Sequence, residues 1–204
     1  AIWLSVPWTA FGGCAIDWKA QGLPHQEFVR SPLPSTYLKP EDLPAQYDLR
    51  NLNRTNFCGK VQTQQNPHVC GSCWAHAATG ALSDRIKLET SGAFDVTLSA
   101  QVLLNFDSKL TGGSCAGGDS RQAYAFMHYF GITDETCTVY EGVDYSDTFG
   151  FHDSLESVQQ HMCHACDWQG NCDWVPTSAL NASAVNLPGV ARRYAVDEYG
   201  WVSG

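Results

Sequence analysis

The chain has 204 residues, of which 44% are hydrophobic and 16% are charged, a composition typical of a folded globular protein. Its 12 Lys and Arg residues against 21 Asp and Glu residues give a formal net charge of -9, and no stretch gathers enough positive charge to neutralise a phosphate backbone. No apolar run approaches the ~20 residues needed to cross a bilayer. These features argue against a nucleic-acid partner and against a membrane-spanning segment.

Nine cysteines are many for a cytosolic protein, and two N-x-[ST] sequons begin at Asn53 and Asn181. Together they predict passage through an oxidising secretory route, with glycosylation at Asn53 and Asn181. The simplest count of the cysteines is four disulfides and one remaining thiol.

Residues 1–42 are rich in proline and turn formers and lack helical periodicity, which predicts an extended segment. Residues 1–11 are apolar but carry no basic residue, so they fit either the remnant of a signal peptide or part of the same segment. We expect the compact part of the chain to begin at Leu43.

The most informative stretch is QQNPHVCGSCW, which ends at Trp74. After it, apolar residues recur every four positions, which predicts a helix that begins near Cys73 and ends at Ser91-Gly92. The residues of this apolar stripe are Trp74, Ala78, Leu82 and Ile86.

A cysteine in the first turn of a helix is suited to be a nucleophile, because the helix N-terminus favours the thiolate over the thiol. Gln64 lies nine positions upstream and can supply an amide N–H to a developing oxyanion. The pair Cys70-Gly-Ser-Cys73 also fits a thioredoxin-type redox motif, although the polar TQQN stretch before it does not predict a buried strand.

Two further helices are expected. Ser99 is a good N-cap for a short apolar helix through Leu104, and a third helix should run through RQAYAFMHYF to a stop at Gly131. Between them lies the glycine-rich turn TGGSCAGGD. From Thr133 to Trp174 the sequence is polar and aperiodic, which predicts a loop-rich segment held by covalent bridges.

That segment also has a possible metal-binding pattern. Cys163, Cys166 and Cys172, with His161 and His164, could ligate zinc, although a secreted protein favours disulfides. We expect no metal and no cofactor.

From Leu43 onward the sequence resembles the papain-like cysteine proteases (the C1A peptidases), and within them the cathepsin X/Z group. Five matches occur in chain order: LPAQYDLRN, CGSCW, LSAQVLLNF, GSCAGG and GITDETC. The resemblance implies a cysteine-type peptidase made as a zymogen, with peptide or protein substrates and its own propeptide as partners, in a lysosomal or extracellular location.

Carried over position by position, the resemblance makes Cys73 the nucleophile and Gln64 the oxyanion-hole glutamine. Gly117 and Gly118 match the glycines that bind the substrate main chain; the alternative is that they form only a turn. The spacing of nine residues between Gln64 and Cys73 is that of the cathepsin X group, where an added loop favours trimming of the substrate's C-terminus. Gln65 stands where that group has the histidine that holds the terminal carboxylate, so the choice between exopeptidase and endopeptidase stays open.

The resemblance also implies a disulfide pattern. The expected pairs are Cys70–Cys115, Cys137–Cys163, Cys166–Cys172 and a propeptide latch, Cys14–Cys73. The latch would hold the nucleophile inert, and Cys58 would be the remaining thiol.

Papain-like enzymes place their catalytic His and Asn roughly 130 to 150 residues after the cysteine, which from Cys73 begins at about position 203. None of the seven histidines has that sequence context. We therefore expect an α+β papain-like fold in which residues 1–42 are a short propeptide and residues 43–204 are the mainly helical left lobe, without the β-rich right lobe. Such a piece would be inactive alone. The alternative is a non-catalytic truncated homologue that acts as a binding or decoy module.

Overall fold

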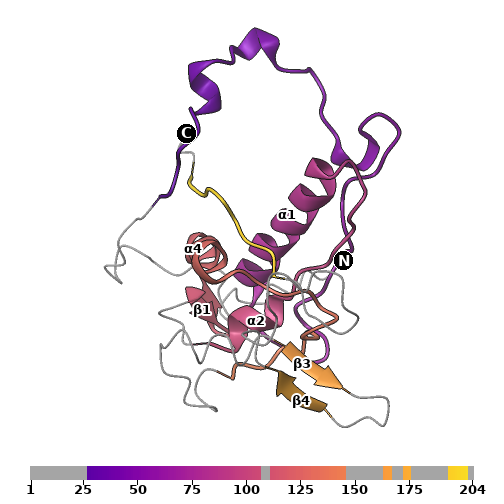
Figure 1. The fold of residues 1–204 in the computed structure, drawn as a ribbon, viewed down its shortest axis with the longest axis vertical. Helices are drawn as coiled ribbons and strands as arrows, with labels where there is room; N and C mark the ends of the chain where they lie inside the picture. Colours follow the sequence, from indigo (N-terminus) through magenta and orange to yellow (C-terminus); the bar gives the residue numbers. More distant parts are fainter. Residues whose placement is uncertain (1–26, 107–110, 146–162, 167–171, 176–192, 202–204) are drawn as a thin grey trace, which may run out of the picture.

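A computed structural model of the protein describes residues 27–106, 111–145 and 193–201, and the backbone of residues 163–166 and 172–175. Its helices are α1 (Cys73–Glu89), α2 (Ala100–Leu104) and α4 (Ser120–Phe130). Its strands form two antiparallel hairpins, β1 (Gly113–Ser114) with β2 (Gly117–Gly118) and β3 (Cys163–Cys166) with β4 (Cys172–Val175). The long helix α1 lies beside α2 and α4 (Figure 1).

Helix α1 confirms the apolar stripe expected from the sequence. Trp74, Ala78 and Leu82 are buried, and Ile86 packs at the edge of the same cluster. The helix ends where Ser91 and Gly92 take positive φ angles and the Gly92 N–H returns to the Lys87 carbonyl oxygen at 2.8 Å.

The two shorter helices also begin and end as expected. The Ser99 side chain accepts a hydrogen bond from the Val102 N–H at the start of α2. At the start of α4 the Asp119 carboxylate accepts one from the Arg121 N–H, and α4 ends at Gly131, whose φ of 71° favours glycine. Capping of this kind gives each short helix a defined first turn.

One hydrophobic core joins the three helices. Its largest fully buried side chains include Phe106, Phe126, Leu98, Leu103, Leu104 and Met127. The rings of Phe106 and Phe126 lie 5.6 Å apart between centroids, which ties the end of α2 to α4. This core holds the N-terminus of α1 in a fixed position.

The β3–β4 hairpin differs from the loop-rich segment expected between residues 133 and 174. Its strands pair Cys163 with Val175 and Cys166 with Cys172. The run CHACDWQGNCDWV has no regular alternation of apolar and polar residues, so its hydropathy gave no strand signal.

The described N-terminal residues form an exposed arc that leads from residue 27 into the body of the molecule (Figure 1). The arc contains short 3-10 helices at Pro34–Thr36, Pro40–Asp42 and Leu49–Asn51. Leu43 is 57% exposed, and the first buried residue in the described part of the chain is Phe57. The domain boundary expected at Leu43 stays a prediction.

The C-terminal residues 193–201, yellow in Figure 1, return to the start of this arc. They form β-bridges from Tyr194 to Ile132 and from Tyr199 to Phe28. The residues expected to be propeptide are therefore in contact with the far end of the chain. Among the helices that the structure describes, none combines the length and apolar character needed to cross a membrane.

Candidate active site

Cys73 is the first residue of α1 and is half-buried. The N–H groups of the first turn point toward this end of the helix, and they favour a negative charge on sulfur. In the structure Cys73 is disulfide-bonded, and its partner lies outside the side chains that the structure describes. The expected partner, Cys14, also lies outside the described residues.

Gln64 lies in the turn that precedes the nucleophile and is half-buried. Its main-chain carbonyl accepts a hydrogen bond from the Tyr140 hydroxyl at 3.0 Å. Among the described residues its side-chain amide has no hydrogen-bond partner. An amide without a protein partner can donate to a substrate oxygen, as an oxyanion hole requires.

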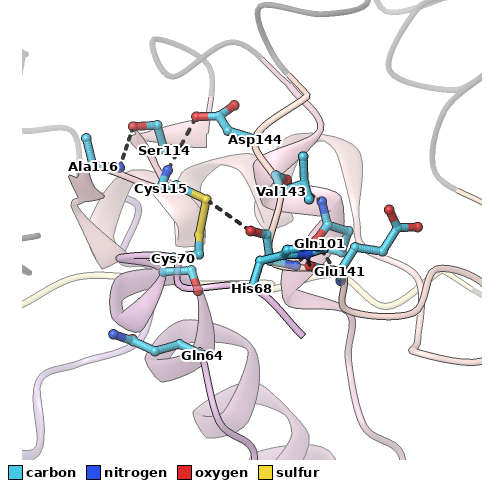
Figure 2. The surroundings of a disulfide bond; sticks show 12 residues. Gln64, His68, Cys70, Gln101, Ser114, Cys115, Ala116, Glu141, Val143 and Asp144 are labelled. Carbon is cyan, nitrogen blue, oxygen red and sulfur yellow. Dashed lines mark hydrogen bonds between the residues drawn. A yellow bond between two sulfur atoms is a disulfide. The ribbon is translucent and has the colours of Figure 1, made fainter. Parts of the chain in front are cut away.

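The Cys70–Cys115 disulfide fastens the loop between Gln64 and Cys73 to the β1–β2 turn. Its Cα atoms are 4.6 Å apart, and Cys70 is 1% exposed. Beside it the Gly71 N–H donates to the Cys115 carbonyl oxygen at 2.8 Å, and a Cβ on Gly71 would lie only 2.6 Å from that oxygen. Figure 2 shows the Gln64 side chain below this disulfide.

Gly117 and Gly118, which we expected to bind substrate main chain, form strand β2 and are both buried. A Cβ on Gly118 would lie 2.5 Å from the Trp74 ring, so this position has a packing reason to be glycine. Trp74 is held in place by its indole N–H, which donates to the Ser114 carbonyl oxygen at 3.1 Å. Close packing therefore explains Gly118, and its substrate-binding role stays a prediction.

Gln65 lies in the exposed loop that follows Gln64. Beneath this loop is a cavity of about 330 Å³ that borders Asn66, Pro67, His76 and Tyr140. Asn66 and Pro67 of this loop thus form part of the wall of the cavity, together with His76 of α1.

The histidines with described side chains all bond to main-chain carbonyl oxygens. His68, His76 and His128 place Nδ1 at 2.9, 3.1 and 2.7 Å from the carbonyl oxygens of Glu141, Ser72 and Val196. A carbonyl oxygen can only accept, so each of these rings carries its proton on Nδ1. That none of the histidines is the catalytic base stays a prediction. The side chains of His25, His152, His161 and His164 lie outside the described residues.

Sequence reasoning did not single out Tyr140. Its hydroxyl contacts Ser72 at 2.6 Å as well as Gln64, and burial raises its pKa, so it is a neutral phenol near pH 7. The residues it joins are 68 and 76 positions away, and no local pattern marks such a contact. Of the residues around it, only Ser72, the N-cap of α1, and His76 are close in sequence, four positions apart.

The remaining expected sites divide between described and undescribed residues. Asn53 is exposed in a turn with a φ of 51°, where an attached glycan would not clash with the core. Asn181 lies outside the described residues.

Cys137 is disulfide-bonded to a side chain outside the described residues, and the register of β3 and β4 sets Cys166 opposite Cys172. Within the described part of the chain, no three His, Cys, Asp or Glu residues are grouped as metal ligands, and the Cys163–Cys172 side chains proposed for zinc lie outside it.

The family model described as "Papain family cysteine protease" matches residues 43–186. Cathepsin Z of Onchocerca volvulus is 32% identical over 165 residues, which is 80% of this chain and 45% of that protein. Cathepsin B-like cysteine proteinase 6 of Caenorhabditis elegans is 38% identical over 93 residues, 45% of this chain and 23% of that protein. The chain thus spans less than half the length of these curated relatives.

Two solved structures are also similar. The proform of the Amb a 11 cysteine protease, a ragweed pollen allergen, matches with a TM-score of 0.38 and 30% identity over 44% of this chain and 26% of that one. Procathepsin L2 from the larval midgut of Tenebrio molitor matches with a TM-score of 0.44 and 27% identity over 51% of this chain and 31% of that one.

Proposed function

Because the chain belongs to the papain family of cysteine proteases, we propose that it is the nucleophile-bearing part of a peptidase that hydrolyses peptide bonds in peptide or protein substrates. One observation carries this proposal. Cys73 begins α1, and the loop that carries Gln64 is fastened next to it by Tyr140 and by the Cys70–Cys115 disulfide.

The proposed reaction uses the Cys73 thiolate to attack the scissile carbonyl carbon, and the electron pair of the C=O bond moves onto oxygen. The Gln64 side-chain amide and the Cys73 main-chain N–H would donate to that oxyanion, where one donor is worth about 2.7–4 kcal/mol. Collapse of the intermediate breaks the C–N bond and leaves a thioester on Cys73. Water then attacks this thioester, which releases the carboxylic acid product and returns the Cys73 thiol. A histidine that is none of the seven in this sequence would hold the thiol proton and pass it to the leaving amine.

Expression from the full reading frame tests this function. After reduction and removal of residues 1–42, the protein should hydrolyse a fluorogenic peptide, and Cys73→Ala should abolish the hydrolysis. Cys58→Ser is the matched control, because Cys58 is a free thiol whose carbonyl oxygen contacts Lys87, in the last turn of α1, whereas Cys73 is the first residue of that helix. Absence of hydrolysis in the unmodified protein would favour the binding or decoy module instead.

Residues 1–42 are proposed as a propeptide and residues 43–204 as part of the catalytic domain. The exposure of Leu43 supports cleavage there, because proteases cut exposed, weakly held backbone. The proposed latch is a Cys14–Cys73 disulfide, and the disulfide-bonded state of Cys73 supports it. A thiolate that attacks the Cys14 sulfur would form a mixed disulfide there and release Cys73 as a thiolate.

We place the protein in the secretory pathway, in a lysosomal or extracellular location. The Cys70–Cys115 disulfide supports an oxidising route, and the exposed turn at Asn53 supports N-glycosylation. The loop at Gln65 would border the side of the cleft that receives the substrate's C-terminal half. Whether the protein acts as an exopeptidase or an endopeptidase would then depend on whether Gln65 can bind the C-terminal carboxylate of the substrate.

A further inference from the structure

A chain of hydrogen bonds links His76 to Gln64 through two hydroxyl groups. The His76 Nδ1 atom lies 3.1 Å from the Ser72 carbonyl oxygen and 3.2 Å from Ser72 Oγ. Ser72 Oγ lies 2.6 Å from the Tyr140 hydroxyl oxygen, which is 3.0 Å from the Gln64 carbonyl oxygen. Ser72 is completely buried and Tyr140 is 8% exposed, so the middle of the chain is shielded from solvent.

The direction of each hydrogen bond follows from the number of protons available. The Gln64 carbonyl oxygen can only accept a hydrogen bond, so the single hydroxyl proton of Tyr140 is donated to it. Ser72 must then donate to Tyr140, which leaves Ser72 Oγ as an acceptor. His76 must therefore carry its proton on Nδ1, because the Ser72 carbonyl also only accepts. The hydroxyls of Ser72 and Tyr140 thus each donate one hydrogen bond, and this series of hydrogen bonds ends at the Gln64 carbonyl oxygen.

Ser72 supports this assignment because it departs from the usual behaviour of an N-cap serine. It occupies the N-cap position of α1, yet its hydroxyl makes no hydrogen bond to the N–H groups of the helix. Serine at this position usually caps the helix and stabilises it by roughly 1 kcal/mol. Here the hydroxyl is directed to Tyr140 instead, which leaves the N–H groups beside Cys73 free of a side-chain cap.

The segment that carries Tyr140 is itself held rigidly by Gln101, a fully buried residue of α2. The Gln101 side-chain oxygen accepts from the N–H groups of Glu141 and Gly142 at 3.0 and 3.1 Å, and its amide donates to the Val143 carbonyl oxygen at 2.7 Å. Figure 2 shows Gln101 against this segment. Tyr140 thus connects the core to the Gln64 turn.

We propose that Tyr140 is a positioning residue for catalysis, which holds the Gln64 turn at a fixed distance from the residue before the nucleophile. This inference rests on the proposed function, because Gln64 must be an oxyanion donor for its position to matter. Without the Tyr140 hydroxyl the Gln64 carbonyl would lose its bond to the core, and the side-chain amide would spend less time directed at the oxyanion. The ring of Tyr140 also contacts His76 edge-on at 4.6 Å between centroids, and a phenylalanine would keep that contact.

The test is Tyr140→Phe in protein expressed from the full reading frame, matured and reduced. Three measurements distinguish an effect on oxyanion stabilisation from an effect on the reactivity of the Cys73 thiol. They are kcat and KM for a peptide, the inhibition constant of a peptide aldehyde, and the rate of Cys73 alkylation by iodoacetamide. The aldehyde forms a tetrahedral adduct whose oxygen needs the oxyanion donors, whereas alkylation creates no oxyanion.

We expect kcat to fall by about tenfold or more at unchanged KM, which is less than the ~100- to 1000-fold loss on deletion of an oxyanion donor. Aldehyde inhibition should weaken by a similar factor, and the alkylation rate should not change. Tyr145→Phe is the matched control, because the Tyr145 hydroxyl contacts the Glu141 carboxylate instead of Gln64, and it should alter none of the three.

Each other outcome has a defined meaning. Unchanged kcat and aldehyde inhibition in Tyr140→Phe would overturn the positioning role. Alkylation that falls as far as kcat would also overturn it, because the hydroxyl would then act on the thiol or on the fold. If the unmodified protein neither cleaves peptides nor binds the aldehyde, the proposed function itself fails, and the positioning role fails with it.

Discussion

Glu198 holds Ser31 across 167 positions of sequence: its carboxylate accepts hydrogen bonds from the Ser31 hydroxyl at 2.5 Å and from the Ser31 N–H at 2.8 Å. The Arg30 N–H adds a third bond at 2.7 Å. Next to them Phe28 and Tyr199 form a β-bridge, and the Phe28 ring lies 4.3 Å from that of His128. The proposed propeptide is thus anchored at a point far from its proposed cleavage site.

This anchor should persist at acidic pH. The hydrogen bonds from Ser31, with those from Arg30, lower the pKa of Glu198 to about 2. A carboxyl whose pKa is lowered on folding stabilises the fold above its unfolded pKa, and that contribution is lost as the pH falls through the folded value. The contact should therefore survive at pH 4–5 and weaken only near pH 2. The ¹³C shift of the Glu198 carboxyl should titrate with a midpoint near 2, and a midpoint near 4.5 would show that the anchor is absent in solution.

The second prediction concerns the glycine beneath Trp74. Gly118→Ala should destabilise the fold by about 1–3 kcal/mol, because the new Cβ would lie 2.5 Å from the indole ring. Gly80→Ala, in α1, is the control. Nothing lies within 4 Å of a Cβ there, so alanine should stabilise the helix by roughly 0.5–1 kcal/mol. Urea unfolding measures the change in the free energy of unfolding for both variants. Equal changes in Gly118→Ala and Gly80→Ala would argue against close packing at Gly118.

The third prediction concerns the order in which disulfides open. Cys70 is 1% exposed, whereas Cys73 is half-buried, so mild reductant should reach the Cys73 bond before Cys70–Cys115. Non-reducing peptide mapping should find Cys73 linked to Cys14. A Cys14–Cys58 link, or a free Cys73 thiol in unprocessed protein, would refute the latch without touching the peptidase assignment.

The fourth prediction is that the 204-residue chain, expressed alone and reduced, has no peptidase turnover. The histidines with described side chains are held by main-chain carbonyl oxygens, and Nδ1 of His76, one turn along α1, is directed to Ser72. In each of these rings the Nδ1 atom faces a carbonyl oxygen, which can only accept, so Nδ1 keeps its proton and cannot take that of Cys73. Cleavage of a fluorogenic peptide that disappears in Cys73→Ala would show that a base is nevertheless present.

The three helices could be predicted from the sequence because their signals are local. The apolar residues from Trp74 to Leu82 in α1 recur every four positions. Ser99 marks the start of α2, and Gly131 marks the end of α4. Cys73 and Gln64 were singled out because their spacing resembles that of a known family, and their catalytic roles stay predictions. Both kinds of signal lie within a few residues of the feature that they predict.

The parts that could not be predicted depend on contacts between distant residues. Tyr140 contacts Gln64 and Ser72, which are 76 and 68 positions away, and Gln101 of α2 holds the segment that follows it. The packing of Gly118 on Trp74 and the β3–β4 register likewise exist only in the folded chain. Local pattern carries no information about such pairs.

The central claim is that Cys73 is a nucleophile directed at bound peptide. A peptidyl diazomethyl ketone tests it most directly, because it alkylates a thiol only where the peptide part first binds. With protein from the full reading frame, matured and reduced, mass spectrometry should find one adduct, on Cys73, and a competing peptide should suppress it. An adduct on the free thiol Cys58, or labelling of Cys73 that a competing peptide does not reduce, would contradict the account.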